Sequence, residues 1–119
     1  METAELILKF IIPLGIFNVW LVRYNKPTPY RGGSATNLKE EFSAYGLSEL
    51  TFYVIGVFKL TAALLILLSV FFTPFLAPGA FIMSALMLGA VLMHAKVGDP
   101  LIRYLPASAM LFMSLLLLV

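Results

Sequence analysis

Cysteine is absent from the 119 residues, and histidine occurs once, at His94. Without cysteine, the chain has no disulfide, thiolate metal site, iron–sulfur cluster or dithiol redox centre. A single imidazole cannot supply both ligands of a bis-histidine haem or complete a zinc site. We therefore expect that this chain alone builds no metal centre and no metal-bound cofactor site.

Charged side chains are also scarce. They make up 12% of the residues, whereas hydrophobic ones make up 61%, and the mean hydropathy is +1.00. A chain with so little polar surface is expected to be an integral membrane protein. The net charge is only +2, and Glu40, Glu41 and Glu49 accompany the basic residues of the longest polar segment. A nucleic-acid partner therefore has no support.

Four apolar runs are candidates for membrane spans. They cover residues 4–22, 50–72, 78–96 and 101–119. The last run is short, because Leu105 to Val119 reaches only about 22 Å as a helix against a hydrocarbon core of roughly 30 Å, so residues 101–104 must join it. We predict an all-α fold, a four-helix integral membrane bundle that forms a single domain over residues 1–119.

Residues 23–49 form the one long polar segment. Its prolines and glycines, between residues 26 and 33, exclude a continuous helix. Further on, Asn37 can cap a short helix whose third residue is Glu40. Three apolar residues then recur at spacings of four and three on one face: Leu38, Phe42 and Tyr45. We predict a short interfacial amphipathic helix between spans one and two.

Basic residues are distributed unevenly between the two ends of the spans. Lys9 lies at the end that carries the amino terminus. Six lie at the other end: Arg23, Lys26, Arg31, Lys39, Lys96 and Arg103. Because basic loops stay in the cytoplasm, we predict a bacterial cytoplasmic membrane protein with residues 23–49 cytoplasmic and both termini on the opposite side. The first span lacks a basic leader and a small-residue cleavage site, so we interpret it as a retained helix.

Lys59 lies well inside the second apolar run, where insertion scales put the cost of a lysine at roughly 3 kcal/mol. The helical rise places Asn18, Lys59 and His94 in the same half of the bundle, with Glu49 and Asp99 at its rim. Small residues beside Lys59 and His94 favour close helix contact, so both side chains should point inward. These five residues are the candidate ligand-binding residues.

Each of these polar residues also has a structural interpretation. Lys59 can extend its stem to the headgroups, His94 can bond a carbonyl at a helix end, and Asn18 can bridge two helices. Methionines in the spans are typical packing residues, although they would suit a soft cavity for an apolar ligand. Five aromatic residues favour a belt at the membrane surface over a stacking site: Trp20, Tyr24, Tyr30, Tyr45 and Tyr104.

Several short motifs resemble those of the DoxX-like family. They are Tyr45-Gly46-Leu47, Gly56-Val57-Phe58-Lys59, Leu88-Gly89-Ala90 and the stretch from His94 to Pro100. The resemblance covers the whole chain and implies a small four-helix membrane protein. It also implies a link to membrane redox chemistry, because members are named for a subunit associated with thiosulfate:quinone oxidoreductase or belong to redox stress complexes. Distant animal relatives are receptor assembly chaperones. No catalytic residue follows from the resemblance.

Two functions of different classes remain open. In the first, the chain is a redox-associated membrane subunit that binds a quinone or another apolar small molecule near Lys59 and His94, and a partner protein supplies the electrons. In the second, it is a non-enzymatic assembly or chaperone-like partner with a filled core and a structural buried ion pair, such as Lys59 with Glu49 or Asp99. An apolar pocket that reaches Lys59 would distinguish the two.

A transporter is a weaker third interpretation, because no internal repeat is visible. The sequence leaves open whether any reaction is catalysed. Membrane lipid and a membrane or peripheral protein are the expected partners, and a homo-oligomer is an open alternative.

Overall fold

The computed structural model describes residues 2–119, and all regular structure in that part of the chain is helical. The all-α prediction is therefore confirmed. In chain order the elements are α1 (Glu2–Phe17), the π-helical turn η1 (Asn18–Val22), α2 (Leu38–Ala44), α3 (Glu49–Leu68), the 3₁₀ turn η2 (Thr73–Phe75), α4 (Leu76–Lys96), the 3₁₀ turn η3 (Leu101–Tyr104) and α5 (Leu105–Leu116).

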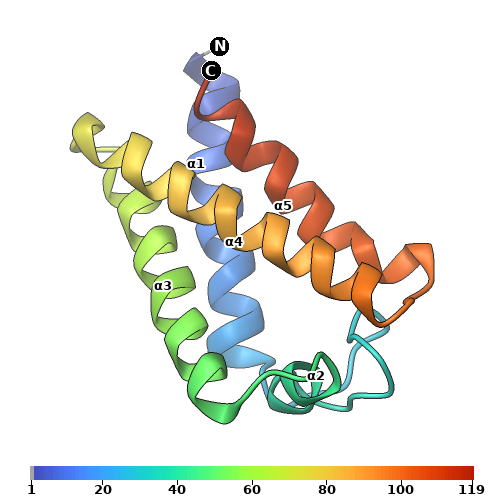
Figure 1. Ribbon diagram of the computed structural model, residues 1–119. Coiled ribbons are helices and arrows are strands. Elements are labelled where there is room, and N and C mark those ends of the chain that lie inside the picture. Colours follow the sequence, from blue (N-terminus) through green and yellow to red (C-terminus); the bar gives the residue numbers. More distant parts are fainter. Residues whose placement is uncertain (1) are drawn as a thin grey trace.

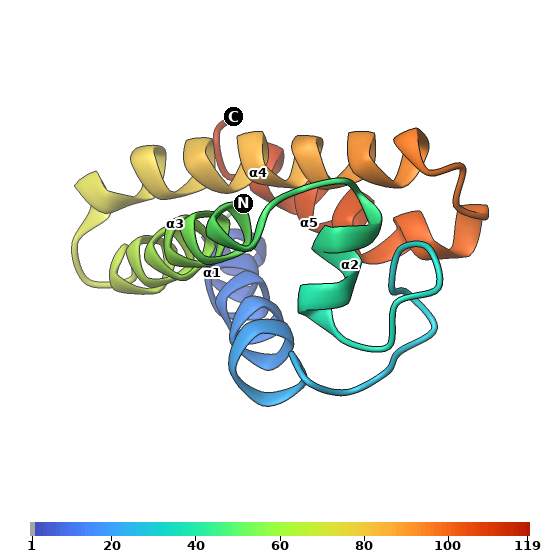
Figure 2. The same ribbon diagram turned by 60° about the horizontal axis from the view of Figure 1, so that its bottom comes forward.

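The long helices pack around α4 and α3. α4 contacts both α3 and α5, and α1 packs mainly against α3. Figure 1 shows the two termini at one end of the molecule and α2, with the polar segment before it, at the opposite end. Turning the molecule brings α2 forward, where it covers the end of the space enclosed by α1, α3, α4 and α5 (Figure 2). The polar segment thus closes one end of the helical assembly.

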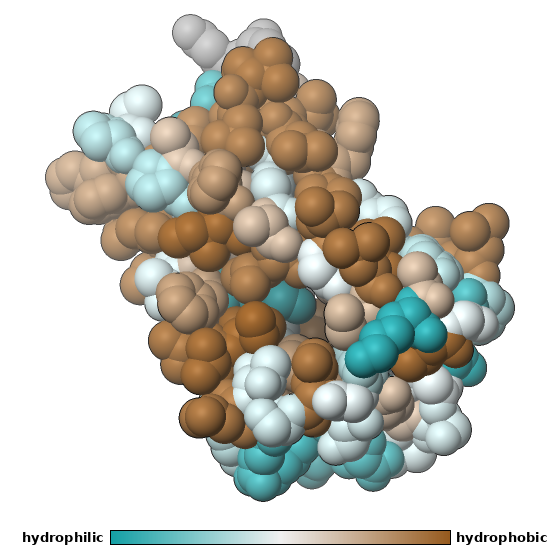
Figure 3. All heavy atoms as spheres, viewed as in Figure 1, coloured by the Kyte–Doolittle hydropathy of each residue, from teal (hydrophilic) through white to brown (hydrophobic). Residues whose placement is uncertain are grey.

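Three helical segments are long and apolar enough to cross a membrane: Thr3–Val22, Glu49–Leu68 and Thr73–Lys96. The fourth apolar helix, Leu101–Leu116, is shorter than these. Figure 3 shows apolar residues covering the long helices, while hydrophilic ones gather at the α2 end. These features support an integral membrane protein. A fourth span, and hence a four-span bundle, stays a prediction.

Two span boundaries differ from the predicted ones. α3 ends at Leu68 rather than near residue 72, because after Ser69 the backbone amides of Val70 and Phe71 bond carbonyls three residues back instead of four, which makes a turn. The next helix begins before the predicted residue 78, since Pro78 occupies the first turn of α4, where proline costs no hydrogen bond.

The predicted short helix between the first two spans is confirmed as α2. The Asn37 side chain accepts a hydrogen bond from the Glu40 amide at 2.8 Å, which satisfies a free donor at the helix start. The apolar stripe of Leu38, Phe42 and Tyr45 is buried. Gly46 ends the helix with a φ of 80°, in the left-handed region that favours glycine. The location of α2 at a membrane interface stays a prediction.

Candidate functional site

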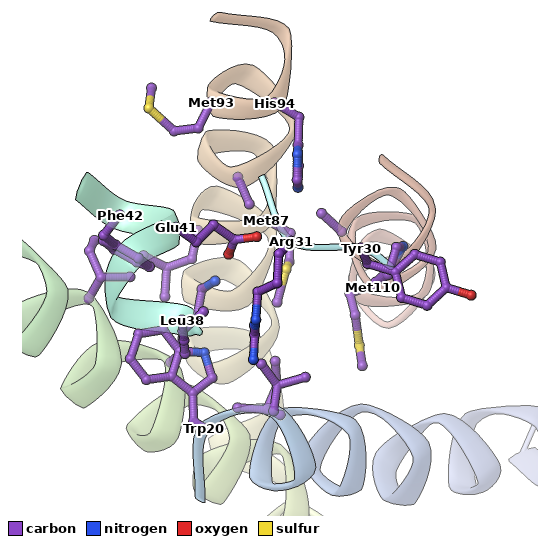
Figure 4. Close-up of a pocket in the computed structure, with 18 of the residues that line it drawn as sticks. Trp20, Tyr30, Arg31, Leu38, Glu41, Phe42, Met87, Met93, His94 and Met110 are labelled. Atoms are coloured by element: carbon purple, nitrogen blue, oxygen red, sulfur yellow. The ribbon is translucent and has the colours of Figure 1, made fainter. Parts of the chain in front are cut away.

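A pocket of about 760 Å³ lies among the long helices at the end covered by α2. Apolar side chains make most of its wall, and three methionines from α4 and α5 contribute to it: Met87, Met93 and Met110. Figure 4 shows side chains from these helices, from α1 and from the polar segment converging on it, and Figure 3 shows a hollow in this face of the molecule. The charged or titratable groups of its lining are Arg23, Tyr30, Arg31, Glu41, Tyr45, Lys59, His94 and Arg103.

An aromatic cluster forms the wall where α1, α2 and α3 meet. The Trp20 ring stacks on Phe52 with centroids 5.3 Å apart and meets the edge of Phe42 at 5.8 Å. Gly56 makes this packing possible, because a Cβ there would lie 2.5 Å from Cζ3 of Trp20. Trp20 is 8% exposed, and Tyr45 is also buried. The interpretation of Trp20 and Tyr45 as residues of a surface aromatic belt is therefore wrong.

Lys59 reaches this pocket and lies against its aromatic wall. Its Nζ is 5.5 Å from the centroid of the Trp20 ring, a cation–π distance. Among residues 3–119, no carboxylate oxygen lies within 4.0 Å of that nitrogen. Glu41, which also lines the pocket, acts on it electrostatically from farther away. The ammonium of Lys59 thus faces the pocket with its hydrogen-bonding capacity available.

The predicted ion pairs of Lys59 with Glu49 or Asp99 are absent from the described residues. Glu49 pairs instead with Lys39 at 2.7 Å, on the surface. Asp99 pairs with His94 and Arg103. The reason is where each carboxylate lies. Glu49 is the first residue of α3 and meets Lys39 of α2, whereas Asp99 follows α4 and meets Arg103 in η3, the turn before α5.

Asp99 organises a buried cluster behind the pocket. Its side chain is 2% exposed, and its carboxylate accepts hydrogen bonds from His94 Nδ1 at 2.7 Å, from the Gly33 amide at 2.9 Å and from Arg103 at 2.9 Å. Arg103 also donates to the carbonyl of Gly33. Burial alone would raise the pKa of Asp99, but the hydrogen bonds from His94, Gly33 and Arg103 outweigh it and hold the pKa below its usual range. The cluster ties the polar segment to α4 and η3.

The carboxylate of Asp99 also fixes the tautomer of His94. Because the ionised Asp99 accepts from Nδ1 of His94, that nitrogen carries a hydrogen, and in a neutral ring Nε2 would be the acceptor. The Tyr45 hydroxyl lies 3.4 Å from the ring nitrogens. Burial raises the pKa of Tyr45, and the carboxylates of Glu41 and Asp99 raise it further, so its hydroxyl remains a donor. The imidazole is thus held in one orientation at the pocket wall.

Arg31 and Glu41 are pocket residues that the sequence did not single out. Arg31 is 6% exposed, and its Nη2 donates to the carbonyls of Arg23 at 2.8 Å and Lys26 at 3.2 Å. Glu41 accepts the Gly32 amide at 2.6 Å. Both belong to a segment that composition marks as polar and exposed. The helical periodicity of α2 places Glu41 near the face of Leu38 and Phe42. This was the only sequence signal that indicated burial of Glu41.

The five predicted ligand-binding residues separate into three groups. Lys59, His94 and Asn18 line the pocket, from α3, α4 and η1. Asp99 stands behind His94, and Glu49 lies on the surface with Lys39. Their role in binding stays a prediction. Within residues 3–119 no group of three or more histidine or acidic side chains is arranged to hold a metal ion.

Comparison with known proteins identifies the family. The model of the DoxX-like family matches residues 33–118, which is most of the chain. The chain belongs to the DoxX-like family. The matched segment contains Lys59, His94 and Asp99, whereas Trp20 and Arg31 precede it. No curated protein and no solved structure matches the chain.

Proposed function

We propose that this DoxX-like membrane protein binds an apolar small molecule with a polar end, such as a quinone, in the pocket beside Lys59 and His94. The chain would act as a redox-associated subunit whose partner protein supplies the electrons. The observation that carries the proposal is a mostly apolar pocket of about 760 Å³ that Lys59 lines. Its ammonium has no carboxylate within 4.0 Å among residues 3–119.

The chemistry of the pocket suits such a ligand. Small-molecule sites are mostly apolar, with a few polar groups that fix orientation. The methionine-rich wall adapts to an irregular ring or tail, and Trp20 offers a flat apolar face. Lys59 would donate a hydrogen bond to a ring oxygen. His94, held by Asp99, would accept or pass a proton at Nε2. An intramembrane cation is costly, so a ligand contact gives it a function.

The distribution of charge supports an orientation in the membrane. The basic residues predicted to be cytoplasmic lie at the α2 end of the molecule, and both termini lie at the other end (Figure 1). By the positive-inside rule, residues 23–49 would face the bacterial cytoplasm. The pocket would then lie in the cytoplasmic half of the membrane, with α5 as a short fourth span and α2 at the interface.

A second candidate function rests on the buried cluster of His94, Asp99 and Arg103. An assembly or chaperone-like partner was expected to contain a structural ion pair of Lys59. The structure contains a structural ion pair, but it joins Asp99 to His94 and Arg103. That function was also expected to leave a filled core, so the apolar pocket that reaches Lys59 counts against it. The two candidates differ in whether a substitution of Lys59 changes ligand binding while the fold persists.

Quenching of tryptophan fluorescence by a short-chain quinone tests the proposal, because Trp20 is the only tryptophan and lines the pocket. The protein is placed in phosphatidylcholine nanodiscs as wild type, Lys59→Met and Lys9→Met. Lys9 is the matched control, since it is also a lysine within a span but bonds the Ser69 carbonyl, away from the pocket.

We expect saturable quenching in the wild type and in Lys9→Met. Affinity should fall about 10-fold or more in Lys59→Met, because a hydrogen bond from a charged donor is worth roughly 1.5–3 kcal/mol. Quenching that rises linearly in all three proteins, as for quinone dissolved in the bilayer, would contradict the proposal.

A further inference from the structure

The polar lining of the pocket carries an excess of positive charge. Arg23, Arg31, Lys59 and Arg103 are basic, and Glu41 is the one acidic residue among the lining side chains. Asp99, behind the wall, neutralises Arg103. Arg23 is exposed to solvent, so Glu41 is left to balance two cations, Arg31 and Lys59. With a neutral ligand, one positive charge would have no counterion in this mostly apolar pocket, where unpaired charges are costly.

Arg31 brings a second oriented cation to the same place. Its side chain is 6% exposed, and its Nη2 is held by the backbone carbonyls of Arg23 and Lys26. Its Nε has no hydrogen-bond partner among residues 3–119, but this atom has almost no accessible surface, so a ligand in the pocket would meet the outer part of the guanidinium. Figure 4 shows Arg31 extending into the pocket between Trp20 and Met110.

We infer that the ligand is an amphiphile with an acidic head, a carboxylate or a phosphate, which the guanidinium of Arg31 and the ammonium of Lys59 bind together. The inference rests on the proposed function and names the class of ligand for the same pocket. Arginine suits this task because its planar donors match the oxygens of carboxylate and phosphate groups. The tail would lie along the methionines of α4 and α5.

An acidic head would give both cations at the pocket wall a partner of opposite charge. Lys59 sits over Trp20, and the Trp20 ring keeps its ammonium at the aromatic wall. Arg31 is anchored by the carbonyls of Arg23 and Lys26, so its donor is oriented before a ligand arrives. An anion that accepts hydrogen bonds from both would relieve the uncompensated charge. The neutral carbonyl of a quinone would accept these bonds less strongly.

Binding of matched ligands to the wild type tests the inference directly. The protein in phosphatidylcholine nanodiscs is titrated with dodecanoate, dodecyl phosphate, dodecanol, inorganic phosphate and a short-chain quinone, and Trp20 fluorescence is read. We expect the two acidic amphiphiles to bind about 10-fold or more tighter than dodecanol, from hydrogen bonds to charged groups. Arg31→Gln should remove most of this preference. Lys39→Gln, which removes an exposed cation from α2, should retain it.

Each other outcome overturns a defined part of the account. Equal affinity for dodecanoate and dodecanol would refute the acidic head and leave the proposed function standing. Inorganic phosphate that binds as tightly as dodecyl phosphate would show an anion site that takes no tail, and would also refute it. If no probe, the quinone included, gives a saturable change, the proposed function itself fails. The wild-type comparison needs no variant, so it decides even if Arg31→Gln does not fold.

Discussion

Asp99→Ala should destabilise the protein more than any other removal of a single carboxylate outside the spans. The side chain of Asp99 is 2% exposed and accepts hydrogen bonds from His94, Gly33 and Arg103. Alanine leaves the guanidinium and the imidazole without their anion. Removing one partner of a buried ion pair costs about 3–5 kcal/mol, because the remaining charge stays desolvated. We expect a loss of that size in the free energy of unfolding.

The assay is equilibrium unfolding in mixed micelles, with sodium dodecyl sulfate as denaturant and far-ultraviolet circular dichroism as the signal. Glu49→Ala is the matched control, because it removes a carboxylate whose pair with Lys39 is exposed, and exposed pairs contribute little. Asp99→Asn should fall between the two, since its amide oxygen still accepts from Gly33 or Arg103. Equal losses for Asp99→Ala and Glu49→Ala would refute the reasoning.

Two further predictions concern packing and pH. Gly56→Ala would place a Cβ 2.5 Å from Trp20, so we expect a shifted tryptophan emission and weaker quinone binding. Gly89→Ala, whose Cβ would meet nothing within 4 Å but would lie at the pocket wall, should leave the emission of the ligand-free protein unchanged. Because hydrogen bonds hold the pKa of Asp99 below its usual value, its contribution to stability is present above the unfolded pKa, about 3.9, and is lost as pH falls through the folded pKa. Melting temperature should therefore drop on acidification below about pH 4, with a smaller drop in Asp99→Asn; identical pH profiles would count against this role.

The sequence predicted the helices well because apolar runs and caps are local signals. Asn37 and the stripe that begins at Leu38 placed α2, and the small residues around Lys59 placed its side chain inward. Those features depend on spacing alone. The family resemblance drawn from the motifs around Lys59 and His94 was confirmed by the match over residues 33–118.

What the sequence could not provide were contacts set by tertiary structure. Arg31 lies in a polar segment, and only the fold buries it against carbonyls of its own loop. Trp20 is a residue type typical of aromatic belts, but the absence of a side chain at Gly56 lets its ring pack against α3 in the interior. Several basic residues could have paired with Asp99 on sequence grounds. The turn before α5 places Arg103 beside it.

Native mass spectrometry of the protein, extracted gently from its own membrane, tests the central claim most directly. Wild type and Lys59→Met are compared at equal yield. The account predicts a small amphiphile or quinone that co-purifies with the wild type and is lost or reduced in the variant. A protein free of ligand, or one that carries the same protein partner in both forms, would contradict it and favour the assembly function.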